Sequence, residues 1–124
     1  MNLFQMGAFN LHSGDTSGWK IECDNLRESD WETLAWLLWK RLPEFGKVVP
    51  IPKGGIELAK ALEKYIVSQS SCIIICDDVM TTGKSLDDSR KSVHSAFDVP
   101  VMGAVAFARK VPPPWIKAVF IYDG

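Results

Sequence analysis

The sequence predicts an α/β protein with a doubly wound, mostly parallel sheet that carries helices on both faces. Three observations support this fold class. Apolar runs without polar alternation recur along the chain, segments with helical spacing separate them, and short turns rich in glycine or small polar residues join a run to the next helix. Such strands are typical of parallel sheets that are buried on both faces. Ligands of these sheets bind beyond the carboxyl ends of the strands.

The first predicted helix follows Ser29, with Glu32 three positions later in the spacing of a capping box. Its apolar stripe recurs at helical spacing and consists of Trp31, Leu34, Ala35, Leu38 and Leu42. Pro43 ends the helix, because proline cannot continue it. Trp36 and Trp39 lie on the opposite face, where they could contact a second copy of the chain, cover a bound base, or pack between two layers of the fold.

The rest of the chain alternates strands, turns and helices. The predicted strands are residues 48–51, 72–76, 101–108 and 118–122. A glycine turn, residues 52–55, leads from the first strand into a helix at 55–66, whose apolar positions are Ile56, Ala59, Leu62 and Ile66. A polar turn at residues 81–85 leads into a second helix at 86–97.

Composition narrows the class of protein. With 124 residues, 47% of them hydrophobic, the chain can build the core of a single domain. A net charge of -1 gives no field that would attract nucleic acid or an anionic membrane. No apolar run approaches the ~20 residues of a membrane-spanning helix, and residues 1–5 lack the pattern of a signal peptide. We therefore expect a soluble, cytoplasmic protein.

The cysteines do not indicate a disulfide framework or a zinc site. Cys23, Cys72 and Cys76 are odd in number and contain no C-x-x-C pair, and His12 and His94 stand apart from them. We expect buried, reduced thiols.

The segment with the clearest chemistry is residues 73–85, in which Asp77 and Asp78 follow a buried strand and precede a small polar turn. Hydroxyls and backbone N–H groups at the start of a helix can bind one phosphate, and the helix dipole favours its negative charge. Carboxylates just before that turn can accept hydrogen bonds from sugar hydroxyls, directly or through a divalent cation. Together these groups predict a site for a phosphorylated ribose.

Two other interpretations compete with this one. A plain strand followed by a capped helix explains Asp78 and Ser85, but not the order of the whole segment. A nucleotide P-loop would share the ending Gly83-Lys84-Ser85, but it requires glycine at the position that Asp78 occupies, and an acid there would face the phosphates.

Residues 74–85 resemble the phosphoribosyl pyrophosphate signature of the type I phosphoribosyltransferases: four apolar residues, two acids, two apolar residues and T-T-G-x-S. The resemblance implies that Asp77 and Asp78 hold the ribose 2'- and 3'-hydroxyls. It also implies a 5'-phosphate site formed by Thr81, Thr82, Gly83, Lys84 and Ser85. Mg²⁺ would be bound through the phosphoribosyl pyrophosphate, with Asp77 or Asp78 as a further ligand.

A second motif, residues 48–55, is similar to the pyrophosphate loop of the same family. Lys53 can neutralise pyrophosphate, and Gly54 lets the backbone approach it closely. The resemblance implies binding roles for both residues and makes Lys53, Asp77 and Asp78 the catalytic candidates. Without the later signature, a Pro-Lys-Gly-Gly sequence would be an ordinary turn.

Residues 7–22 resemble the N-terminal segment of orotate phosphoribosyltransferases, so residues 1–28 are expected to form a hood and 29–124 the α/β core. His12 stands where that family has a substrate-facing lysine; it would contact pyrophosphate or base, or be a surface histidine. Thr81 stands where purine-specific relatives carry an acid. Arg109, with Lys110 as the other candidate, lies near the position of a base-binding arginine, or is simply a cation at a strand end.

The chain departs from the orotate family between the two motifs, where only residues 56–71 replace a strand and a mobile basic loop. Two functions remain open. The first is transfer of a phosphoribosyl group to a nucleobase, a pyrimidine such as orotate, in nucleotide metabolism. The second is a non-catalytic regulatory protein that binds phosphoribosyl pyrophosphate. The resemblance also leads us to expect a homodimer.

Overall fold

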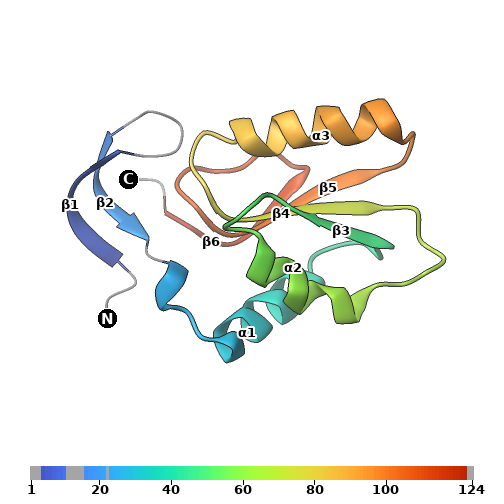
Figure 1. Cartoon of the computed structure of the whole chain (residues 1–124), viewed down its shortest axis with the longest axis horizontal. Helices are drawn as coiled ribbons and strands as arrows, with labels where there is room; N and C mark the ends of the chain where they lie inside the picture. Colours follow the sequence, from blue (N-terminus) through green and yellow to red (C-terminus); the bar gives the residue numbers. More distant parts are fainter. Residues whose placement is uncertain (1–3, 11–15, 22, 123–124) are drawn as a thin grey trace.

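The computed structural model describes residues 4–10, 16–21 and 23–122. Its centre is a four-stranded sheet in which every neighbouring pair is parallel (Figure 1). In spatial order the strands are β3 (Lys47–Pro50), β4 (Ile73–Met80), β5 (Val101–Ala108) and β6 (Ile116–Ile121).

Helices cover both faces of the sheet. Helices α1 (Glu28–Trp39) and α2 (Ile56–Leu62) pack together on one face, and α3 (Lys84–Ala96) covers the other (Figure 1). Two 3-10 turns, η1 (Cys23–Asn25) and η2 (Glu63–Tyr65), lie before α1 and after α2.

Each face of the sheet has its own hydrophobic core. Along β4, Ile74 and Cys76 join the core under α1 and α2, whereas Ile73 and Ile75 join the core under α3. Because successive side chains of a strand point to opposite faces, burial on both sides requires a continuous apolar run. The predicted doubly wound α/β fold is therefore confirmed.

The N-terminal segment contains an antiparallel pair, β1 (Phe4–Asn10) and β2 (Thr16–Ile21). It lies on the side of the molecule to which the carboxyl ends of the parallel strands point (Figure 1). The division into a hood at 1–28 and a core at 29–124 stays a prediction.

Several local expectations need correction. Helix α1 begins at Glu28, and the carboxylate of Asp30, not Glu32, accepts a hydrogen bond from the backbone N–H of Arg27 at 2.8 Å. In α2 the buried residues are Leu58, Ala59, Ala61 and Leu62. Ile56 and Ile66, expected on the apolar face, are exposed. The short helix fits either stripe by periodicity, and packing against α1 and the sheet selects one.

Between β3 and β4 the structure has α2, η2 and the connection 66–72, with no further strand. The expectation that this interval is too short for a strand and a long loop is confirmed. The three cysteines are buried and unbridged, as expected. Among the described residues, no helix combines the length and the apolar character needed to cross a bilayer.

The glycine turn is fastened to the end of β4. The backbone N–H of Ile51 donates to the carbonyl of Cys76 at 2.8 Å, and that of Gly55 donates to the carbonyl of Ile51 at 2.9 Å. The Cys76 thiol donates to the Gly55 carbonyl at 3.5 Å; burial raises its pKa to about 12, so it stays protonated. A Cβ on Gly55 would collide with the Cys76 carbonyl.

Gly55→Ala should therefore lower the free energy of unfolding by roughly 1–3 kcal/mol, because the added methyl meets backbone atoms that cannot move aside. Urea unfolding measures this difference. The control is Lys60→Ala, at an exposed site in α2, the helix that follows Gly55. Its free energy of unfolding should stay within about 0.5 kcal/mol of the parent. Equal stability of Gly55→Ala and the control would show that the turn is not held tightly against β4.

Candidate functional site

The acid pair Asp77 and Asp78 lies inside β4, whereas the sequence placed it after the strand. Asp77 and Val79 still pair with β5, opposite Val105 and Phe107. One Asp77 oxygen accepts the backbone N–H of Asp78 at 2.8 Å, and one Asp78 oxygen accepts the N–H of Val79 at 2.7 Å. The two half-buried carboxylates are thus held at the carboxyl end of the strand.

The environment of Asp77 disfavours its charge. Burial is the main cause, and the neighbouring Asp78 carboxylate adds to it, so that the pKa of Asp77 rises to about 8. Asp77 therefore favours its protonated form at neutral pH. A cation or a hydrogen-bond donor brought to the pair would favour the ionised form.

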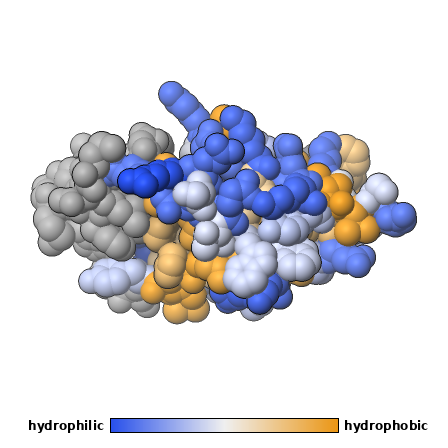
Figure 2. Space-filling view, turned by 90° about the horizontal axis from the view of Figure 1, so that it is seen from below, coloured by the Kyte–Doolittle hydropathy of each residue, from blue (hydrophilic) through white to orange (hydrophobic). Residues whose placement is uncertain are grey.

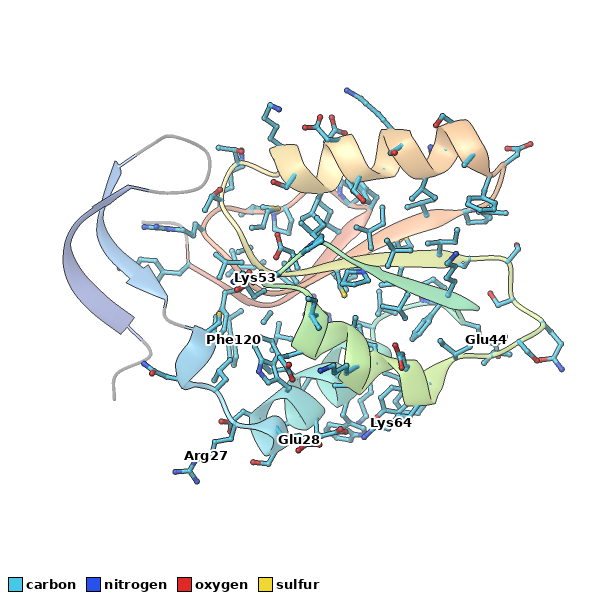
Figure 3. All side chains as sticks on the ribbon, viewed as in Figure 1. Arg27, Glu28, Glu44, Lys53, Lys64 and Phe120 are labelled. Atoms are coloured by element: carbon cyan, nitrogen blue, oxygen red, sulfur yellow. The ribbon has the colours of Figure 1, made fainter. Side chains whose placement is uncertain are left out.

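The glycine turn meets the acid pair directly. A Cβ on Gly54 would lie 2.5 to 2.7 Å from the carboxylate atoms of Asp78, so a side chain at this position would force that carboxylate to move. The preceding Pro52–Lys53 peptide bond is cis. Lys53 is exposed, and it lies on the side of the molecule where the strands end (Figure 3). The structure therefore brings together two motifs that are separated in the sequence.

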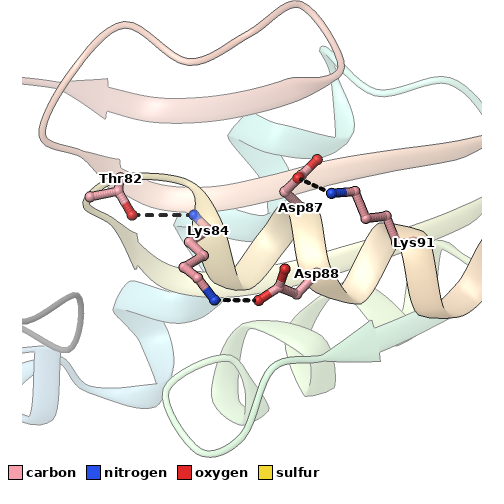
Figure 4. A network of polar contacts seen from close by, with 5 residues as sticks. All are labelled: Thr82, Lys84, Asp87, Asp88 and Lys91. Atoms are coloured by element: carbon pink, nitrogen blue, oxygen red, sulfur yellow. Dashed lines mark hydrogen bonds and ion pairs between the residues drawn. The ribbon is translucent and has the colours of Figure 1, made fainter.

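The phosphate turn, residues 81–85, joins β4 to α3. Gly83 is its pivot, with a φ of 87°, a left-handed conformation that favours glycine. The Thr82 hydroxyl accepts the backbone N–H of Lys84 at 3.3 Å (Figure 4). The first-turn N–H groups of a helix have no acceptor within it, and the dipole makes this end positive. This arrangement suits an anion such as phosphate.

Lys84 and Ser85 belong to the first turn of α3, which begins two residues earlier than the predicted 86. The Lys84 ammonium pairs with Asp88 at 3.0 Å, and Lys91 pairs with Asp87 at 3.2 Å (Figure 4). The Lys84 side chain thus follows the outside of the helix, and its backbone N–H, which already donates to Thr82, could bind an anion only in place of that hydrogen bond.

Arg109 directly follows β5, and its backbone N–H donates to the carbonyl of Met80 at 2.9 Å. It is therefore tied to the end of β4, on the same edge of the sheet as the acid pair. Burial lowers the pKa of Arg109, yet a guanidinium remains protonated at neutral pH. Lys110 is exposed. The third candidate for base contact, His12, lies outside the described residues.

Sequence reasoning missed an apolar groove at the ends of β5 and β6. Its volume is about 500 Å³, and α1 forms its other wall. The sequence predicts a strand over 118–122, and the apolar character of Phe120, Ile121 and Tyr122 does not distinguish a buried strand end from an exposed one. Instead, all three side chains are exposed.

Solved structures with the same architecture identify the fold. The chain superposes on UMP synthase of Leishmania donovani with a TM-score of 0.78 and 18% identity, covering 96% of this chain and 33% of that one. For orotate phosphoribosyltransferase from Aeropyrum pernix the TM-score is 0.75 and the identity 21%, covering 96% and 88% of the two chains. The chain has the fold of the type I phosphoribosyltransferases.

Xanthine-guanine-hypoxanthine phosphoribosyltransferase from Helicobacter pylori also shares this phosphoribosyltransferase fold, with a TM-score of 0.55 and 17% identity, covering 75% of this chain and 78% of that one. By sequence, the chain matches no protein-family model and no curated protein. The chain spans about a third of the Leishmania chain, so the overlap concerns one part of that protein. The resemblance stated from the two motifs is confirmed for the fold.

The raised pKa of Asp77 predicts how stability depends on pH. The folded chain keeps this proton where the unfolded chain has lost it. The contribution of Asp77 to the free energy of unfolding is thus complete below the unfolded value of 3.8 and is lost as the pH rises through about 8. Asp77→Asn cannot ionise and should exceed the parent in stability by on the order of 1 kcal/mol at about pH 9.

Denaturant unfolding from about pH 4 to about pH 9 measures this difference, which should widen as the pH rises. Asp88→Asn, at an exposed site on α3, controls for the change in net charge. If the difference in the free energy of unfolding between Asp77→Asn and the parent is the same at all pH values, the pKa of Asp77 is not raised in the folded chain.

Proposed function

We propose that this chain binds 5-phosphoribosyl-1-pyrophosphate at the edge formed by the glycine turn, the acid pair and the phosphate turn. The observation that carries the proposal is the contact of Gly54 with the Asp78 carboxylate. It joins a turn suited to pyrophosphate to a pair of acids suited to a sugar diol. The N-terminus of α3, which the phosphate turn joins to β4, provides a position for a phosphate.

Each group of the ligand has a counterpart in this arrangement. Asp77 and Asp78 would accept hydrogen bonds from the ribose 2'- and 3'-hydroxyls. Residues 81–85 would surround the 5'-phosphate with backbone N–H groups and hydroxyls. Lys53 and the backbone at Gly54 would face the pyrophosphate.

Magnesium fits this site only together with the ligand. Mg²⁺ prefers oxygen ligands and is commonly held by one or two carboxylates plus substrate phosphates. The part of the chain that the structure describes contains no group of three or more metal-ligating side chains. Asp77 or Asp78 would therefore share the ion with the pyrophosphate. When bound, Mg²⁺ would neutralise charge on the leaving group.

The reaction we propose is transfer of the phosphoribosyl group to a nucleobase, with release of pyrophosphate. A ring nitrogen of the base would attack C1 of the ribose as the bond from C1 to the pyrophosphate oxygen breaks. Lys53 would stabilise the departing charge. A pyrimidine such as orotate is favoured because Arg109 can pair with a carboxylate on the base. Thr81 stands where purine-specific relatives carry an acid, and a threonine cannot supply that charge to a purine ring.

The share of this chain that aligns with the solved structures supports the choice of a pyrimidine. The orotate phosphoribosyltransferase covers 96% of this chain, and the purine enzyme covers 75%. We further propose a role in nucleotide metabolism in the cytoplasm. We also propose that two copies of this chain form a homodimer, as the resemblance leads us to expect.

A specific observation favours a second candidate function, binding without catalysis. Residues 66–72 are the only connection between η2 and β4, and they contain no basic residue. Efficient transfer needs charge directed at the leaving pyrophosphate and exclusion of water. Lys53 supplies only one charge. The same site could therefore serve a regulatory protein that senses phosphoribosyl pyrophosphate.

Asp77→Asn with Asp78→Asn should weaken binding of phosphoribosyl pyrophosphate at least about 100-fold, because two charge-assisted hydrogen bonds are lost at roughly 1.5 to 3 kcal/mol each. Isothermal titration calorimetry with Mg²⁺ measures the affinity. The matched control is Asp87→Asn with Asp88→Asn, which removes the same charge from exposed positions on α3 and should bind like the parent. If both double variants titrate like the parent, the acid pair does not hold the ribose.

Turnover should be slow even where binding is intact. Pyrophosphate release with orotate, uracil and purines should fall well below an ordinary enzymatic rate of about 10 per second. The physical reason is that the acid pair and phosphate turn act on the ground state as well as the transition state. An ordinary rate, independent of protein concentration, would show that this fold needs no basic loop and would rule out the purely regulatory function.

A further inference from the structure

Cys76 is the residue of β4 that directly precedes the acid pair. It pairs with Pro50 of β3 on one side and with Ala104 of β5 on the other. Its side chain is fully buried in the core under α1 and α2. Seen from the side of these helices, apolar and polar side chains form a closed surface over the sheet (Figure 2). Water therefore does not compete for the hydrogen bonds of the Cys76 thiol.

This one residue holds both ends of the glycine turn. Its carbonyl accepts the backbone N–H of Ile51, just before the turn, at 2.8 Å. Its thiol donates to the carbonyl of Gly55, the last residue of the turn, at 3.5 Å. The same Gly55 carbonyl accepts the N–H of Ala59 in α2 at 2.9 Å. The thiol therefore also fastens the start of α2 to β4.

The residues between these two attachments are the ones proposed to face pyrophosphate. Lys53 and Gly54 stand between Ile51 and Gly55. Their backbone N–H groups donate to no backbone carbonyl among the described residues, which leaves two donors for an anion. The direction in which these donors point depends on how firmly the two ends of the turn are held.

The two attachments make different demands on the side chain at position 76. A backbone carbonyl is present with any residue, whereas the bond to Gly55 needs a side chain that donates and also fits a fully buried apolar position. Cysteine meets both demands, because it packs as a small hydrophobic residue and its S–H is a weak donor. Alanine would fit the core but could not donate.

We propose that Cys76 is a positioning residue for pyrophosphate, whose thiol fixes the end of the glycine turn and thereby places Lys53 and the backbone of Gly54. This role rests on the proposed function, which assigns the glycine turn to the pyrophosphate part of the ligand. Without the thiol the turn occupies further conformations, and the affinity falls with the fraction that remains competent to bind. The ribose and its 5'-phosphate would bind to the acid pair and the phosphate turn, so their binding is spared.

The test compares Cys76→Ala with Cys72→Ala by calorimetry, with magnesium pyrophosphate and ribose 5-phosphate as separate probes. Cys72 is the matched control, because it is also buried and its thiol contacts only the carbonyl of the adjacent Ile73, at 4.0 Å. Cys76→Ala should weaken pyrophosphate binding at least about fivefold, the equivalent of one hydrogen bond. Its affinity for ribose 5-phosphate, and both affinities of Cys72→Ala, should stay within about twofold of the parent.

Cys76→Ser separates hydrogen-bond donation from the bulk of the sulfur. A hydroxyl also donates, so this variant should bind pyrophosphate within about twofold of the parent. Three results would overturn the proposal: equal pyrophosphate affinities of Cys76→Ala and Cys72→Ala, an equal loss for both probes in Cys76→Ala, or a serine variant that binds as weakly as the alanine variant.

Hydrogen exchange of the ligand-free chain keeps this proposal distinct from the proposed function. The backbone N–H of Gly55 donates to Ile51, and in Cys76→Ala it should exchange at least about fivefold faster than in Cys72→Ala, because the end of the turn opens more often. If the parent binds no phosphoribosyl pyrophosphate, the proposed function is wrong, and faster exchange at Gly55 still supports the attachment of the turn by Cys76. Equal exchange in the two variants would show that the thiol does not hold the turn.

Discussion

The structure depends on the close packing of the glycine turn against the carboxyl end of β4. The backbone N–H of Ile51 donates a hydrogen bond to the carbonyl of Cys76. Because Gly54 and Gly55 have no side chains, the turn can pack closely against β4. Any side chain at these glycines would meet either the Cys76 carbonyl or the Asp78 carboxylate. This contact brings the turn that carries Lys53 to the end of β4, where the acid pair lies.

The candidate site contains a carboxyl group, Asp77, whose charged form is disfavoured in the folded chain. Burial at the end of β4, together with the neighbouring Asp78 carboxylate, raises the pKa of Asp77 and reduces the stability of the folded chain at neutral pH. The phosphate turn leads into the N-terminus of α3, where the helix dipole is positive and favours an anion. The acids and the helix end would thus favour ligands that bring a cation or hydroxyls to the acids and a phosphate to the helix. Under the proposed function, binding of such a ligand would raise the free energy of unfolding.

Much of the fold follows from the sequence, because continuous apolar runs admit few other arrangements. The strand Val101–Ala108 was predicted with its observed bounds, and both glycine-containing turns were placed. The apolar run predicts a strand that ends at residue 76, yet pairing with β5 carries β4 through Asp77 to Met80. The contact of Gly54 with Asp78 and the apolar groove could not be predicted, since both depend on how distant segments lie in space.

If the glycine turn, the acid pair and the phosphate turn act as one binding site, all three should respond together to the ligand. Titration of the ¹⁵N-labelled chain with phosphoribosyl pyrophosphate and Mg²⁺, followed by two-dimensional NMR, tests it most directly. The account predicts that the amide signals of Gly54, Asp78 and Gly83 shift together and saturate with one dissociation constant. Shifts confined to only one of these segments, or no shifts at millimolar ligand, would contradict it.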